Sequence, residues 1–202
     1  MHSNYDFDSF QEIRRMVETA KASWAIWFKL YAYEAGGHDF ALPIQLHFPL
    51  FDAIRESSQH ITIMNLDALF KGRKDTHSLA NLLDACESRL MPNQAKQCRA
   101  KLDSVKPLVK GVGILRGNYF GHRIRTKSRE TFFAEAGLKI RDIDELLETA
   151  NWIMWQLACA FIPKEHGITK DLQQSVTSSL NDVLQLLREK FDALGKSLGE
   201  TP

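Results

Sequence analysis

The sequence predicts an all-α protein, and three observations support this prediction. Apolar residues recur at three- and four-residue steps along most of the 202-residue chain. No alternating apolar and polar run, bounded by turns, predicts a strand. No internal repeat or low-complexity segment interrupts the helical pattern. We therefore expect an up-and-down bundle of about five to seven helices, with a C-terminal helical extension.

The composition is typical of a globular protein with one well-filled core. Hydrophobic residues make up 44% of the chain and charged residues 25%. The formal net charge of +1 excludes a generally polybasic binder, so any attraction to nucleic acid must come from a local patch. Cys86, Cys98 and Cys159 form no CxxC pair, and we expect reduced core thiols.

The N-terminus and the apolar windows predict a cytoplasmic protein. The N-terminus lacks the basic region and the apolar run of a signal peptide. The most apolar window, Trp152 to Ile162, has about half the length needed to span a bilayer. We therefore expect no membrane partner.

The first half of the chain predicts three long helices. Ser9 and Glu12 form a capping box before the first helix, and Gly36-Gly37 can end it. Pro43 suits the first turn of a second helix, which runs to about Phe70 and is followed by a charged turn. Asp75 or Thr76 then caps a third helix, which stops near Pro92.

The second half predicts shorter helices and one long helix. Asn93 can cap a fourth segment, and Pro107 opens the helix after it. A short helix is expected around Phe132 and Phe133. Asp142 opens a long apolar helix that Pro163 and Gly167 close.

The last predicted helix carries one apolar stripe. Its members are Leu172, Val176, Leu180, Val183, Leu187, Phe191 and Leu194. We expect a bundle over residues 1–162 and a C-terminal helix within residues 163–202. That helix packs either on the bundle or on a partner subunit.

The stretch from Arg116 to His122 is the strongest candidate for chemistry. It reads Arg116-Gly117-Asn118-Tyr119-Phe120-Gly121-His122. No Asp or Glu occurs from Ser104 until Glu130. The cations in that gap are Lys106, Lys110, Arg116, Arg123, Arg125, Lys127 and Arg129. A titratable imidazole beside a permanent cation in a basic field suits chemistry on a phosphodiester.

Helical geometry alone does not bring this arginine and histidine together. In a straight helix, residues six apart are separated by about 9 Å along the axis. They also point about 120° apart around it. Gly117 and Gly121 can lower the cost of bending or ending the helix between them, or they can permit close helix packing.

The arrangement around this motif resembles the HEPN superfamily, and most closely its AbiU-like branch, which is linked to abortive infection. The resemblance covers roughly residues 10 to 162 and rests on the Arg-x5-His spacing in an all-helical chain. Apolar residues precede the arginine, and the segment Ile140–Leu147 is similar to the helix that follows the motif. The apolar run Ile61–Phe70, a charged turn and a leucine helix from Ser78 are also similar to that branch.

The resemblance implies a helical homodimer in which two copies of the motif face each other. Many such proteins are metal-independent endoribonucleases, often toxins. Arg116 and His122 would be catalytic and Asn118 would support them. One histidine cannot easily serve as both the base and the acid, whereas a twofold dimer supplies His122 twice.

Two positions depart from the pattern of the superfamily. The polar residue commonly follows the arginine directly, whereas Gly117 stands there and Asn118 comes one step later. If Asn118 does not replace it, the fold is kept and the activity is lost. In one branch a tyrosine that becomes nucleotidylated stands two residues beyond the histidine, whereas this chain has Ile124. We therefore expect no such regulation.

Basic and aromatic residues around the motif are candidates for RNA binding. They are Arg123, Arg125, Lys127, Arg129, Lys110 and Tyr119. The loop from Arg123 to Arg129 either contacts phosphates or forms only a solvated surface.

Other candidates are weaker. The histidines show no metal-ligand spacing, and we expect no metal and no cofactor. His47, His60 and Asn65 read as buried, hydrogen-bonded groups on an apolar helix. The tryptophans lie at helical spacing, so a core role is favoured over base stacking; they are Trp24, Trp27, Trp152 and Trp155.

The leading hypothesis is an endoribonuclease that acts as a toxin or in phage defence, with RNA as substrate and an antitoxin protein as a further partner. The first alternative is an inactive RNA-binding or protein-interaction module of the same fold. A second alternative is a structural helical protein whose C-terminal stripe docks a partner.

Overall fold

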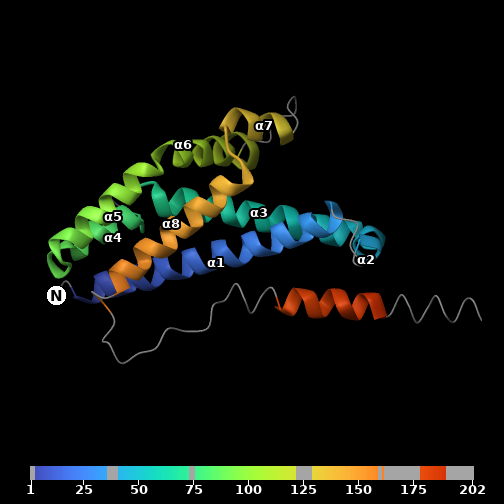
Figure 1. The fold of residues 1–202 in the computed structure, drawn as a ribbon, viewed down its shortest axis with the longest axis horizontal. Helices are drawn as coiled ribbons and strands as arrows, with labels where there is room; N and C mark the ends of the chain where they lie inside the picture. The colour runs from blue at the N-terminus through green and yellow to red at the C-terminus, as the bar shows by residue number, and fades with distance from the viewer. Residues whose placement is uncertain are drawn as a thin grey trace, which may run out of the picture. The chain divides into compact units, whose positions relative to one another are not determined.

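The computed structural model describes residues 3–35, 41–72, 76–121, 129–158, 161 and 178–189. These residues are helical almost throughout and contain no β-strand, so the prediction of an all-α fold is confirmed. The elements in order are α1 (Ser3–Ala35), α2 (Ala41–Leu46), α3 (Phe48–Phe70), α4 (Leu79–Cys86), the 3₁₀ turn η1 (Glu87–Arg89), α5 (Pro92–Ser104), α6 (Lys106–Ile114), the π-helix η2 (Leu115–Gly121), α7 (Arg129–Ala136) and α8 (Ile140–Ala158) (Figure 1). A further helical segment covers residues 178–189.

The chain divides into two compact units. The first comprises Met1–Ala20 and Thr62–Thr169, and the second comprises Lys21–Ile61 and Lys170–Pro202. Both α1 and α3 therefore contribute to each unit. The Arg116–His122 stretch belongs to the first unit.

The first unit is built around α8, which packs on α4, α5 and α6. The buried apolar residues of α8 recur at helical spacing on one face, which explains why this helix forms and what it buries. They are Ile143, Leu146, Leu147, Ala150, Ile153, Met154 and Leu157. Phe10 and Ile13 of α1 and Leu69 of α3 join the same core, where they meet the leucines of α4. Burial of this much apolar surface is the main favourable contribution to the fold.

The second unit has a smaller core. Leu30, Ile44 and Phe51 are buried together with Leu184 from the 178–189 segment. The hydroxyl of Tyr33 also donates a hydrogen bond of 2.9 Å to Oδ1 of Asn181 in that segment. The buried face of the segment thus follows Leu184, and Val183, which we expected in the stripe, is exposed.

Several predicted helix ends differ from the structure. α1 begins at Ser3, and the expected cap Ser9 is a buried residue inside it. The predicted second helix is two helices, α2 and α3, which meet at His47. Ser78 caps α4, because its Oγ accepts a hydrogen bond of 3.3 Å from the backbone N–H of Asn81. Several polar residues are neighbours in the sequence near the starts of α1 and α4, and only the folded backbone decides which of them caps the helix.

Two further predicted starts depend on prolines. α5 begins at Pro92, with Met91 before it, so the expected cap Asn93 lies inside the helix. Pro107 lies in the first turn of α6, as predicted. The predicted boundary at residues 162–163 and the ends at Pro163 and Gly167 fall outside the described residues and stay predictions.

Burial also corrects several expectations. Trp24 and Trp27 are buried and stack with ring centroids 4.5 Å apart, whereas Trp155 is 52% exposed. His47 and His60 are exposed, because His47 lies in the turn between two helices and His60 lies on the outer side of α3. No helix in the described part of the chain is both long and apolar enough to cross a membrane.

Candidate functional site

The motif lies on an unusual piece of helix. α6 continues without a break into η2, whose backbone has π-helical geometry from Leu115 to Gly121. In a π-helix each hydrogen bond spans five residues, so the turn is wider than in an α-helix. Such turns are rare and frequently occur at functional sites. The sequence left two roles open for the glycines, namely a bend or end of the helix between Arg116 and His122, or close helix packing. The structure has a widened turn from Leu115 to Gly121.

Arg116 is held by a buried carboxylate. Its Nε lies 3.3 Å from Oδ2 of Asp67 on α3, and its side chain is 40% exposed while that of Asp67 is 7% exposed. A guanidinium has five N–H donors, so an ion pair through Nε leaves donor capacity for a ligand. The anchor from α3 therefore restricts the position of the arginine without exhausting its donors.

Asp67 also interacts with a second cation. Its Oδ1 lies 3.6 Å from Nζ of Lys71, the residue that follows the end of α3. Neither Asp67 nor Lys71 was among the predicted site residues. The available signal was that Asp67 is the one charged residue in the run Ile61–Phe70. A buried carboxylate requires a compensating charge, and this requirement points to a cation elsewhere in the chain.

Gly117 faces open space. A Cβ atom built on Gly117 would have no heavy atom within 4 Å, and its φ is not positive. Close helix packing therefore does not explain this glycine, and a polar side chain would fit there. Asn118, the next residue, is half-buried in the same turn.

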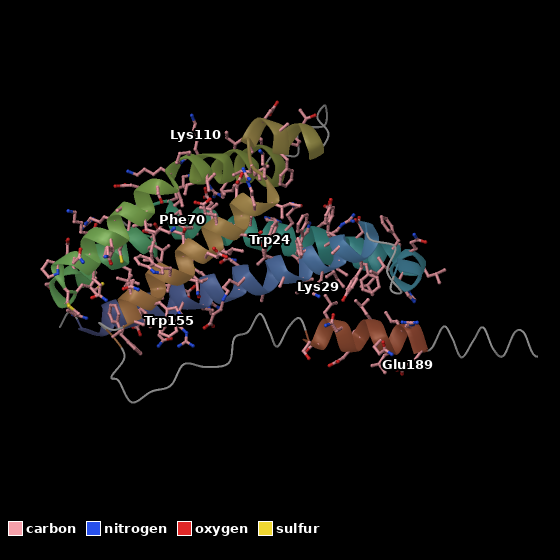
Figure 2. All side chains as sticks on the ribbon, in the orientation of Figure 1. Trp24, Lys29, Phe70, Lys110, Trp155 and Glu189 are labelled. Atoms are coloured by element: carbon pink, nitrogen blue, oxygen red, sulfur yellow. The ribbon has the colours of Figure 1, made fainter. Side chains whose placement is uncertain are left out.

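The segment that carries the remaining predicted residues joins two elements that pack together. His122, Arg123, Arg125 and Lys127 lie outside the described residues, as do the side chains of Tyr119 and Arg129. Their roles stay predictions. The segment leaves η2 after Gly121 and enters α7 at residue 129, and α7 packs on both α6 and η2. Lys110 is exposed on α6 (Figure 2).

A glycine sets the approach of α7 to α6. A Cβ on the buried Gly111 would lie 2.6 Å from the carbonyl oxygen of Ala136 and 2.8 Å from Cγ of Leu138. Gly137, which follows α7, has a φ of +65°, and the chain turns there so that Leu138 lies against Gly111. Only a residue without a side chain at Gly111 allows α7 to lie this close to α6.

The remaining chemistry-bearing groups do not form a second centre in the described residues. No group of three or more His, Cys, Asp or Glu side chains there is arranged to hold a metal ion. Cys86 and Cys98 are free and buried, and burial raises the pKa of the Cys98 thiol. A raised pKa makes a thiol less nucleophilic near neutral pH, so Cys98 reads as a core residue.

Comparison with known proteins identifies a family for this chain. The HEPN protein family described as AbiU2 matches residues 10–158, which include most of α1, all the elements from α2 to α8, and the whole of η2. No curated protein matches the chain. No solved structure matches it either.

Proposed function

This chain belongs to the AbiU2 family of HEPN proteins, and on that premise we propose that it is a metal-independent endoribonuclease that acts as a toxin or as an abortive-infection effector against phage. The observation that carries the proposal is Arg116, anchored by the buried Asp67 in a π-helical turn that directly precedes His122. We further propose that the protein works as a homodimer in the cytoplasm and that a cognate antitoxin protein restrains it.

The reaction needs one proton acceptor and one proton donor. The acceptor takes the proton of the RNA's 2′-hydroxyl, the 2′-oxygen bonds to phosphorus, and the bond from phosphorus to the 5′-oxygen breaks. The donor protonates that 5′-oxygen, so that the products are a 2′,3′-cyclic phosphate and a 5′-hydroxyl. An imidazole with an ordinary pKa of about 6.5 can serve as acceptor or as donor, and two copies of His122 fill both roles.

Arg116 stabilises the charge that develops on the phosphorus-bound oxygens. A fixed cation is more effective than a mobile one, because it needs no reorganisation during the reaction. The pair between Arg116 and Asp67, with 3.3 Å between Nε and Oδ2, supports this role. Asn118 orients the imidazole or holds a phosphate oxygen. The basic residues Arg123, Arg125 and Lys127 contact the flanking phosphates.

The test compares cleavage of total RNA in EDTA by the wild type and by His122→Ala. Loss of a general acid or base is expected to lower the rate about 10²- to 10⁴-fold. His60→Ala is the matched control, because His60 is exposed on α3 and lies in the other compact unit. Equal cleavage by wild type and His122→Ala, or cleavage by neither, would remove the catalytic assignment.

A second candidate function is an RNA-binding or protein-interaction module without catalysis. Gly117 favours this alternative, because it supplies no polar side chain directly after the arginine, although the space around it would admit one. This alternative predicts salt-dependent RNA binding by the wild type and no new RNA ends after long incubation. Appearance of His122-dependent ends would exclude it.

A further inference from the structure

The cluster around Asp67 carries more positive than negative charge. One buried carboxylate faces two cations, Arg116 at 3.3 Å and Lys71 at 3.6 Å, which leaves one positive charge unbalanced among these three groups. Each cation pairs with a different carboxylate oxygen, so the single carboxylate holds both in one neighbourhood. The RNA backbone carries one negative charge on each phosphodiester and is attracted to this excess of positive charge.

The two cations present their charge to solvent. The side chains of Arg116 and Lys71 are 40% and 45% exposed, whereas the carboxylate between them is buried. The separation of 3.6 Å between Nζ and Oδ1 exceeds the range of an N–H···O hydrogen bond, about 2.7–3.2 Å. An ammonium group has three donors, so Lys71 is held by charge while its N–H groups can serve a ligand.

The backbone at Lys71 is also fixed. Its N–H donates a hydrogen bond of 2.9 Å to the carbonyl oxygen of Asp67, which continues the α3 pattern by one residue. A lysine with a fixed backbone and a flexible side chain suits a phosphate, because its ammonium group acts as a compact point charge. The alternative role of Lys71 is purely structural, since a cation after the last turn of a helix interacts favourably with its dipole.

We propose that Lys71, the residue that follows α3, is an RNA phosphate-binding residue of the Arg116 site and lies outside the Arg-x5-His motif. The proposal rests on the proposed function in that RNA is the ligand. Asp67 is then the group that places both phosphate-binding cations. Lys71 binds one phosphate beside the phosphodiester that Arg116 engages, and it takes no part in proton transfer.

The experiment measures binding of a short 2′-O-methyl oligoribonucleotide, which lacks the attacking hydroxyl and cannot be cleaved by this reaction. Dissociation constants are measured from low to moderate salt for wild type, Lys71→Ala, Lys71→Arg and Lys106→Ala. Lys106 is the matched control: it pairs with Asp103 at 2.7 Å, and the described part of the chain places no arginine on that carboxylate. Thermal unfolding of each variant reports any structural effect.

Loss of one phosphate contact is expected to reduce the slope of log K against log salt by about 0.7 in magnitude. Lys71→Ala should show this loss and weaker binding, while Lys71→Arg and Lys106→Ala keep the wild-type slope. A wild-type slope in Lys71→Ala overturns the inference and leaves the nuclease proposal standing. If Lys71→Ala has a reduced slope and the wild type does not cleave RNA, the inference is supported and the nuclease proposal is refuted. Absence of wild-type binding overturns the inference.

Discussion

Gly111 and Gly117 lie on the same continuous helix, yet alanine is expected to act in opposite directions at the two positions. At Gly111 a Cβ would lie 2.6 Å from the carbonyl oxygen of Ala136, which belongs to the backbone and cannot rotate away. At Gly117 the same atom would meet nothing within 4 Å. The two substitutions add the same methyl group, so the difference between them reports packing alone.

The magnitudes follow from this geometry. Overpacking at a buried contact costs about 1–3 kcal/mol, and for a chain of this size each 1 kcal/mol shifts Tm by about 2–4 °C. Gly111→Ala is therefore expected to lower Tm by about 2–12 °C. Replacing glycine by alanine where the backbone allows it gains about 0.4–1 kcal/mol, so Gly117→Ala is expected to raise Tm by about 1–4 °C.

The assay is thermal unfolding followed by circular dichroism at a helix band, with both variants and the wild type at equal concentration. If Gly111→Ala is as stable as the wild type, α7 does not approach α6 as closely as described. If Gly117→Ala is destabilised, the space around this position is not open.

Two further predictions concern ionisable groups. Asp67→Asn is expected to change the free energy of unfolding by no more than about 1 kcal/mol, because both its partners are more than a third exposed. The same variant should lower RNA cleavage about 10- to 100-fold, because Arg116 loses its anchor. Unchanged kcat in Asp67→Asn would contradict the positioning role. For Cys98, burial raises the pKa of the thiol, so the folded state keeps a proton that the unfolded state loses above about pH 8.5. This thiol's contribution to stability is therefore complete below that pH and is lost as the pH rises. Urea unfolding at pH 8 and pH 9.5 should show a smaller alkaline loss in Cys98→Ala, and an equal loss in both proteins would rule out this thiol as the cause.

Periodicity predicted the fold because burial in a helical bundle depends mainly on which face of each helix is apolar. The stripe of α8 from Ile143 to Leu157 needed no tertiary information. Helix ends were less predictable: at the start of α4 the cap is Ser78 rather than Asp75 or Thr76, and all three residue types can fill that position. The exposure of Trp155 likewise depends on which elements pack on α8, and these are distant in sequence.

The candidate site was predictable only in its local part. The spacing of Arg116 and His122 lies within one short stretch and could be found directly. Asp67 on α3 pairs with Arg116, and Lys71, which follows that helix, pairs with the same carboxylate. No pattern of residue spacing links this part of the chain with the motif. The π-helical turn was also not predictable, because the residues of η2 carry no distinct signature for it.

If Arg116 and His122 cleave RNA through its own 2′-hydroxyl, the chemistry of the new ends is fixed. These ends are identified on a defined RNA that is incubated in EDTA with wild type and with His122→Ala. The wild type is expected to produce 2′,3′-cyclic phosphate and 5′-hydroxyl ends, and the variant is expected to produce neither. Ends carrying a 5′-phosphate, or the same ends at the same rate from His122→Ala, would contradict it.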